Sequence, residues 1–167
     1  MLISSVCHGY TKNNFYTIDS NGWVVKSTPV GEVFVCSDCS DLVQVQISYG
    51  NEAGNNTPFH NDKQFVEAFD TPEKKKQFAN MLLEGAMPSE NYDLDIIAVG
   101  DDHIGGLKAI RYSAIIKMSR DMLTRETTLI TMHKNRIVKF SANFYENKLS
   151  GKSAILLEKL SNSLKFL

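Results

Sequence analysis

The amino-acid sequence predicts an α+β fold in which an antiparallel β-sheet is covered by helices, built as one domain over residues 1–167. Three observations predict it. Short strand-like segments open the chain, two helical patterns follow, and longer strand-like segments lead to a final amphipathic helix. A chain of 167 residues with a hydrophobic fraction of 43% can bury a sizeable core without disulfides or metal.

The first part of the chain predicts four short strands. They cover residues 15–18, 23–26, 32–36 and 43–47. A turn-rich cluster at 19–22 separates the first two strands. In the fourth strand, Val43, Val45 and Ile47 alternate with polar residues and therefore share one face. A polar loop, residues 50–61, follows this strand.

Two helices are expected after this loop. Asn61 or Asp62 can cap a short helix, and Thr71-Pro72 supplies the N-cap and first residue of a longer one. The buried residues expected on these helices are Phe65, Val66 and Phe69 on the first and Phe78, Met81 and Leu82 on the second. The three lysines at 74–76 are expected on a solvated face.

The second half predicts strands at 94–99, 107–118, 124–132 and 137–144, and a closing helix that begins near Ser150. Polar residues at 100–103 are expected to form a turn, and Arg120-Asp121 and Lys134-Asn135 are expected to form two more. The closing helix has a leucine stripe with a 3.6-residue period, made of Leu156, Leu157, Leu160 and Leu164.

The order of these elements, with a glycine pair before the long meander, resembles the PsbP-like fold, which includes DcrB-type bacterial proteins. The residues that carry the resemblance are Phe15 and Ile18 with Gly22-Trp23, the segment Gly105-Gly106-Leu107-Lys108-Ala109-Ile110-Arg111, the hairpin around Asn135, and the ending Leu160, Ser163, Leu164, Lys165 and Phe166. The resemblance spans most of the chain and implies protein binding or assistance in assembly. The chain departs from the pattern in its cysteines and in its 50–61 loop.

Charge and hydropathy exclude some classes of function. The chain carries 18 basic and 19 acidic residues, and this balance argues against a nucleic-acid binder and against a polybasic membrane-surface protein. No apolar run approaches the roughly 20 residues that span a bilayer. The protein is then either cytosolic or the mature form of an exported chain, and of these we expect an exported, periplasmic protein. The sequence leaves the oligomeric state open.

The three cysteines leave two interpretations. Cys36 and Cys39 have CxxC spacing in a predicted turn between strands, where free or loosely paired thiols are expected. The alternative is a small metal-binding or redox domain in which Cys7-His8 supplies the second ligand pair of a zinc site. We therefore assign no metal ligand and no cofactor.

Gly151-Lys152-Ser153 looks like part of a phosphate-binding loop. Such a loop needs another glycine five residues before Gly151, where the chain has Glu146. We interpret these residues as the start of the closing helix. Because the sequence also lacks HExxH and GxSxG motifs, we assign no catalytic residue and expect a protein other than an enzyme.

The expected function is protein binding, by a non-catalytic domain of the bacterial accessory, chaperone or toxin-immunity kind. The candidate contact residues lie in two polar segments and are Phe59, His60, Asp101, Asp102 and His103. Each has a structural alternative, because Asp101–His103 suits a turn and Phe59 can equally anchor an interface or plug the core. Trp23 is expected in the core. A small-ligand carrier, which would need an apolar pocket, is a further alternative.

Overall fold

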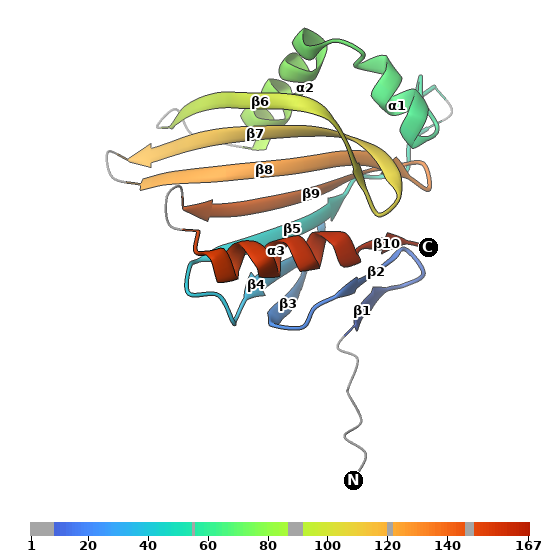
Figure 1. The fold of residues 1–167 in the computed structure, drawn as a ribbon. Helices are drawn as coiled ribbons and strands as arrows, with labels where there is room; N and C mark the ends of the chain where they lie inside the picture. The colour runs from blue at the N-terminus through green and yellow to red at the C-terminus, as the bar shows by residue number, and fades with distance from the viewer. Residues whose placement is uncertain (1–8, 55, 87–91, 120–121, 146–148) are drawn as a thin grey trace.

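A computed structural model describes residues 9–54, 56–86, 92–119, 122–145 and 149–167 (Figure 1). Its main element is a seven-stranded sheet with the strand order β3-β4-β5-β9-β8-β7-β6. The strands are β3 (Trp23–Thr28), β4 (Gly31–Cys36), β5 (Val43–Tyr49), β6 (Asp93–Ile104), β7 (Leu107–Ser119), β8 (Met122–His133) and β9 (Arg136–Tyr145). Every neighbouring pair is antiparallel, which confirms the expected α+β class with an antiparallel sheet.

Helices cover both faces of this sheet (Figure 1). We call α3 side the face covered by α3 (Gly151–Ser163) and by a small sheet of β1 (Gly9–Lys12), β2 (Tyr16–Asp19) and β10 (Lys165–Phe166). We call α2 side the face covered by α1 (Asp62–Ala68) and α2 (Pro72–Ala86). Side chains along the central strand β9 point alternately to the two faces of the sheet. Val138 and Phe140 belong to the core under α3, whereas Ile137 packs against the core under α1 and α2.

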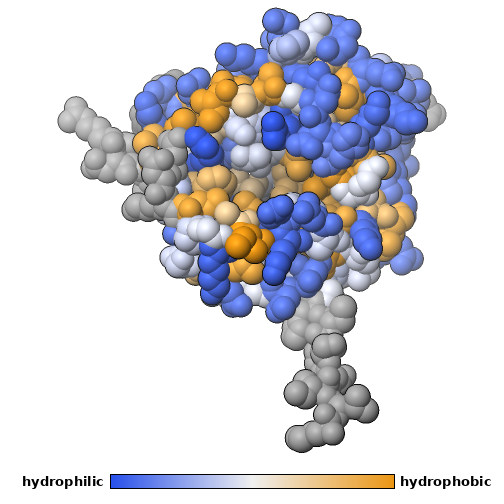
Figure 2. Space-filling view, viewed as in Figure 1, coloured by the Kyte–Doolittle hydropathy of each residue, from blue (hydrophilic) through white to orange (hydrophobic). Residues whose placement is uncertain are grey.

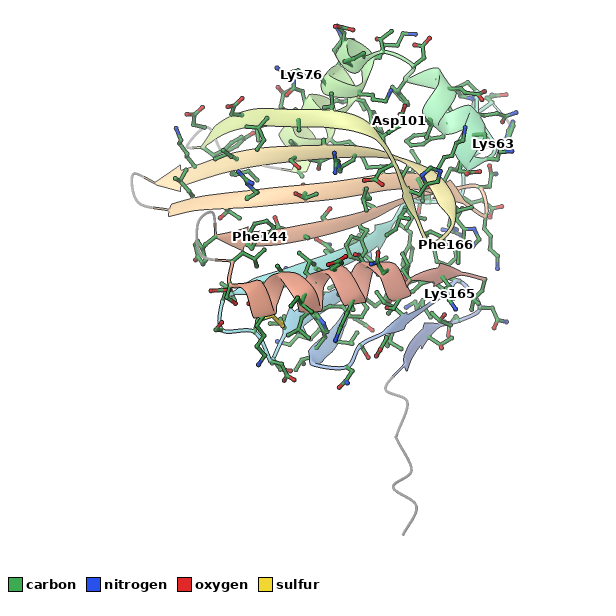
Figure 3. All side chains as sticks on the ribbon, viewed as in Figure 1. Lys63, Lys76, Asp101, Phe144, Lys165 and Phe166 are labelled. Atoms are coloured by element: carbon green, nitrogen blue, oxygen red, sulfur yellow. A yellow bond between two sulfur atoms is a disulfide. The ribbon has the colours of Figure 1, made fainter. Side chains whose placement is uncertain are left out.

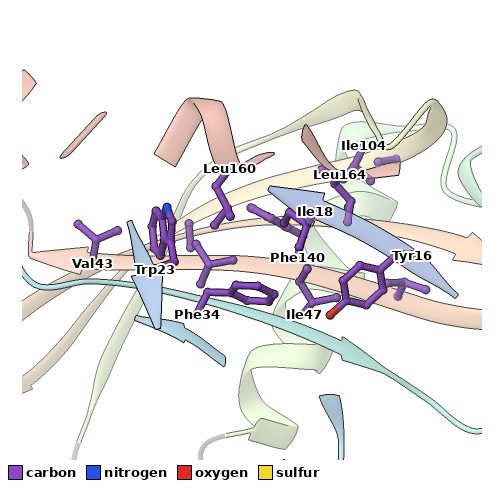
Figure 4. Packing of buried hydrophobic residues seen from close by; sticks show 14 residues of the cluster. Tyr16, Ile18, Trp23, Phe34, Val43, Ile47, Ile104, Phe140, Leu160 and Leu164 are labelled. Atoms are coloured by element: carbon purple, nitrogen blue, oxygen red, sulfur yellow. The ribbon is translucent and has the colours of Figure 1, made fainter. Parts of the chain in front are cut away.

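The α3 side holds the larger core, in which strands and helix meet. Phe34 and Ile47 from the sheet are fully buried against Tyr16 of the small sheet and Leu160 of α3 (Figure 4). Trp23 is 7% exposed, so its expected place in the core is confirmed. Viewed as in Figure 1, the surface shows several groups of apolar residues separated by hydrophilic ones (Figure 2).

The α2 side holds a second core built on aromatic rings. Phe65 is fully buried and Phe78 is 7% exposed, and both pack over Ile110, Ile130 and Met132 of the sheet. The expected stripe on α2 is right for Phe78 and wrong for Met81, whose side chain is 60% exposed. In the next turn of α2, the buried residue is Leu83, which is 3% exposed.

The helices begin at the residues that their sequence signals predicted. The side chain of Asn61 accepts a hydrogen bond from the Gln64 amide, and the side chain of Ser150 accepts one from the Ser153 amide. Thr71 accepts from the Lys74 amide at 3.3 Å, with Pro72 as the first residue of α2. The start of α3 at Gly151 confirms the interpretation of the GKS segment as a helix start.

The turns of the long meander depend on residues with positive φ. Gly105 and Gly106 have φ of 59° and 87° and connect β6 to β7, and Lys134 and Asn135 form the β8–β9 turn with φ of 46° and 58°. The expected turn at 100–103 is wrong, because those residues continue β6 to Ile104. The glycine pair takes the turn because left-handed backbone costs glycine little. The turn expected at 120–121 lies outside the described residues.

Candidate functional site

An apolar groove opens on the α2 side between the two helices and the sheet. It has a volume of about 490 Å³. Its walls are formed by Phe59 from the loop, Phe69 at the end of α1, Phe78 and Met81 of α2, and Ile137 of β9. Lys74 and Gln77 provide polar groups at its border.

Aromatic packing fixes the walls of the groove. Phe69 stacks on Phe78 with ring centroids 4.4 Å apart, and Phe65 contacts both rings edge-on from the core below. Phe59 stands edge-on to Phe65 at 5.3 Å. Rings held by several neighbours lose little further freedom when a ligand binds, so the walls are preorganised.

Met81 gives the groove an adaptable edge. It lies one turn after Phe78 and two turns after Lys74 on the same face of α2, so these residues form a continuous strip along the groove. A methionine exposed by 60% offers a flexible apolar surface that can adapt to the shape of what it contacts. The groove therefore combines a rigid aromatic wall with a mobile thioether.

The border of the groove carries a charged pair. The Lys74 ammonium lies 2.7 Å from the Asp70 carboxylate, one helical turn apart. Its hydrogen bond holds the pKa of Asp70 below the usual value. An apolar centre with a charged, hydrated border is the usual anatomy of a protein interface.

The structure places the predicted contact residues in three different surroundings. Phe59 is half-buried and lines the groove. His60 is exposed beside it, and its backbone amide donates to Oε1 of Gln64 at 2.9 Å. Asp101 lies beneath α1 and α2 (Figure 3), whereas Asp102 and His103 line a separate pocket near the end of α3.

Asp101 has a structural partner. Lys75, expected on a solvated face, is 5% exposed, and its ammonium lies 3.1 Å from the Asp101 carboxylate. The expectation for Lys75 is wrong because α2 lies over β6, which places this lysine against the strand. The pair links α2 to the edge of the sheet, since its buried cation needs an anion to offset desolvation.

A buried carboxylate joins the two sheets on the α3 side. Glu32 is fully buried and accepts from Lys12 at 2.7 Å, from the Tyr16 hydroxyl at 2.7 Å and from the Tyr49 hydroxyl at 3.2 Å. Burial, then the bond to Glu32, raises the pKa of Tyr16, and the same carboxylate raises the pKa of Lys12. Three donors satisfy the carboxylate, so we assign this network to structure.

The cysteine pair is oxidised. Cys36 and Cys39 are joined in a disulfide, so of the two expected forms, free or loosely paired thiols, the structure has the paired one. Cys36 ends β4 and both residues pack against the first core near Trp23. Cys7 and His8 lie outside the described residues. Within the described ranges, no three His, Cys, Asp or Glu residues gather where they could hold a metal ion.

The sequence indicated some of the groove and missed the rest. Phe59 was named because it is an aromatic residue in a loop. Met81 was assigned to the core because it falls on the helical period of Phe78. Ile137 lies on a strand with alternating apolar residues, and no local signal shows that α2 stops short of covering it.

Similarity to known proteins is found at the level of structure alone. No protein-family model and no curated protein sequence matches the chain. The whole chain superposes on 98% of cyanobacterial PsbP from Synechocystis sp. PCC 6803, with a TM-score of 0.64 and 10% identity. For the Ran-binding protein Mog1p of Saccharomyces cerevisiae, 89% of this chain matches 88% of that one, with a TM-score of 0.53 and 10% identity.

A protein from Bacteroides thetaiotaomicron VPI-5482 is similar to 95% of this chain, with a TM-score of 0.55 and 11% identity. The chain spans 48% of the length of that protein. These likenesses confirm the resemblance drawn from the sequence, and the chain has the PsbP-like fold. None of the described helices is both long enough and apolar enough to cross a membrane.

Proposed function

We propose that this chain is a non-catalytic domain that binds a partner protein in the groove on the α2 side. The observation that carries the proposal is the exposed Met81 beside the stacked rings of Phe69 and Phe78. Leaving apolar surface in water costs about 25 cal/mol per Å², and a partner that covers it recovers this free energy. The occupant we expect is an apolar segment of a protein.

The chemistry of the groove favours a protein as its occupant. Aromatic residues and methionine are enriched in the centres of protein interfaces, and hydrated charges such as Lys74 and Asp70 surround those centres. Phe59, and the neighbouring His60, would belong to the contact surface. An accessory protein, a chaperone and an immunity protein that covers a toxin would each use such a surface.

The structural neighbours support the proposal by analogy. The yeast neighbour is named a Ran-binding protein, so a protein of this fold binds another protein. Fold likeness at 10% identity carries no information on which partner this chain binds. The residues of the groove therefore carry the proposal, and the analogy adds to it.

Two surface variants with similar exposure test the proposal. Met81 is 60% exposed in the groove, and Ile155 is 54% exposed on α3. We expect Met81→Glu to abolish the stoichiometric capture of a partner from the native organism, and Ile155→Glu to retain it. Both changes should alter the free energy of unfolding by less than about 0.5 kcal/mol, because both positions face water. Equal capture by both variants, or a measurable turnover without a partner, would contradict the proposal.

A small-ligand carrier is the second candidate, favoured by the volume of the groove. Sites for small molecules usually have about 300–1,000 Å³, and this groove has about 490 Å³. Native mass spectrometry of the protein purified from its own host separates the two functions. A carrier would retain an apolar small molecule that Met81→Glu releases, whereas a partner-binding domain would be free of one.

A further inference from the structure

A second pocket lies on the opposite side of the sheet from the groove. It has a volume of about 350 Å³ and is formed where the β6–β7 turn meets the C-terminal end of α3. Asp102 and the glycine turn form one wall, and Ser161 and Asn162 form the other. The two walls come from residues about 60 positions apart in the chain, so neither is visible as a motif.

The pocket has an electronegative border. The Asp102 carboxylate supplies a negative charge, and its Oδ1 is held by the His103 amide at 2.8 Å. The C-terminal end of α3 adds the negative end of the helix dipole, and the last turn of α3 contains no basic residue. Glu158 lies one helical turn before Ser161 and Asn162, on the same side of α3.

The floor of the pocket is apolar. Ile104 and Leu164 are 4% and 3% exposed, and Leu129 is half-buried beside them. A negative border above an aliphatic floor matches a group with a hydrocarbon stem and a cationic head. Lysine and arginine have this form, because their methylene groups cover apolar surface while the charge remains near water.

We propose that this pocket binds an alkylammonium or guanidinium group on a short aliphatic stem, with the cation on Asp102 and the stem on Leu129. Arg111 is an internal cation beside this carboxylate, and its Nη1 lies 3.7 Å from Oδ2 of Asp102. That separation exceeds a hydrogen bond, so the carboxylate keeps capacity for a closer donor. Arg111 competes with the ligand for the carboxylate.

The proposal is independent of the groove on the α2 side. Met81 and the aromatic walls of the groove lie on the other face of the sheet, so a change there leaves this pocket intact. Failure of one proposal therefore says nothing of the other. If both hold, the protein presents an apolar contact on one face and a cation-binding contact on the other.

NMR titration of the intact protein with three small probes tests the pocket. N-acetyl-lysine amide and N-acetyl-arginine amide carry the proposed group, and N-acetyl-norleucine amide lacks the charge. We expect the two cationic probes to give saturable shifts in the amides of Gly105, Gly106, Ser161 and Asn162. The norleucine probe should bind at least about tenfold more weakly, because it lacks the charge-assisted hydrogen bond.

Three variants make the test specific. Asp102→Asn should lower the affinity for the cationic probes about tenfold. Asp95→Asn, a change on the same strand outside the pocket, should leave that affinity unchanged. Arg111→Gln removes the competing cation and should strengthen binding by up to about fivefold. Spectra that overlay away from the pocket show that each variant is folded.

The same titration separates the two sources of such a group. Equal affinity for n-butylamine and for N-acetyl-lysine amide would assign the pocket to free amines. Tighter binding of the amide would assign it to a side chain within a peptide. Equal binding of the norleucine probe, or an affinity that Asp102→Asn leaves unchanged, would overturn the proposal.

Discussion

The two faces of the seven-stranded sheet bury their apolar residues in different ways. On the α3 side, the helix and the small sheet close over the core, and even the carboxylate of Glu32 is fully buried, where it accepts from its donors. On the α2 side, two helices cover only part of the sheet, and a groove with an exposed methionine remains beside them. Both cores are apolar and well packed, so the difference lies in how completely they are covered.

This difference in coverage indicates which residues maintain the fold and which are available for binding. The core on the α3 side is closed, and its buried carboxylate, Glu32, is satisfied by three donors within the chain. A side that leaves stacked aromatic rings next to solvent has unused binding free energy. Substitutions in the core of the α3 side should therefore act on stability, and substitutions in the groove should act on binding.

The largest expected effect is at Gly31, which begins β4 next to Glu32. Its φ is 150°, and a Cβ there would lie 2.0 Å from the carbonyl oxygen of Ile47. We expect Gly31→Ala to lower the free energy of unfolding by more than about 4 kcal/mol, because the neighbouring backbone would have to move. Gly100→Ala in β6 is the control, since a Cβ at Gly100 meets nothing within 4 Å. Urea denaturation of the two variants measures the difference, and equal losses would contradict the explanation.

The next effect compares two tyrosines on opposite sides. The Tyr16 hydroxyl donates to fully buried Glu32, and the Tyr112 hydroxyl donates at 2.6 Å to Glu126, which is half-buried. We expect Tyr16→Phe to cost about 2–3 kcal/mol and Tyr112→Phe about 1 kcal/mol, because water can replace the lost donor only at Glu126. Chemical denaturation of both variants checks this. A larger loss for Tyr112→Phe would show that the α2 side is the more tightly closed one.

The disulfide gives a smaller effect on the α3 side. Cys36 and Cys39 are three residues apart, so the loop that their bond closes is short. The loss of chain entropy in the unfolded state then contributes at most about 2 kcal/mol. We expect the double change Cys36→Ser and Cys39→Ser to lower stability by this amount while binding in the groove is kept. Denaturation of the parent protein with and without a reductant is the control, and a loss of partner capture would argue for a functional disulfide.

The smallest effect is on the dependence of stability on pH. His133 lies between Phe15 and Phe166, with ring centroids 5.1 and 4.7 Å away. Burial lowers the pKa of its imidazole, and the charge of Lys134 lowers it further. A hydrogen bond with the Leu167 carbonyl raises the pKa but does not offset the burial. A lowered pKa means that the folded state prefers the neutral ring. Stability is therefore complete above the unfolded pKa of about 6.5 and is lost as the pH falls toward the folded value.

His133→Gln should remove this loss, which thermal unfolding between pH 5 and pH 8 would reveal. His60→Gln on the α2 side is the matched control and should keep the dependence of the parent protein. An unchanged dependence in His133→Gln would assign it to other groups.

The sequence predicted the fold well because its signals are local. Helix caps at Asn61 and Ser150 and the glycine pair at Gly105 act within a few residues, and each is found where the chain indicated it. The strands of the long meander follow from alternation and β-branched residues. Their pairing follows from the short connections between them.

The sites could not be predicted in the same way because they depend on contacts between distant segments. Glu32 looks like the polar start of a strand, and its burial depends on Lys12 and Tyr16 of another sheet. Lys75 stands between two exposed lysines, and only the approach of α2 to Asp101 buries it. Met81 falls on the helical period of the buried residues of α2, but its side chain is exposed because none of the described segments packs over it there.

The strand β6 forms one edge of the large sheet and carries four aspartates, Asp93, Asp95, Asp101 and Asp102. Its pairing with β7 is also irregular between Ile96 and Ala98. Unpaired backbone groups at a sheet edge are a template for joining to another copy, and charge and a bulge oppose this. Two copies brought together along β6 would place negative charges against each other. The acidic, irregular edge thus disfavours the addition of a second copy along β6, which keeps the large sheet from extending beyond one molecule.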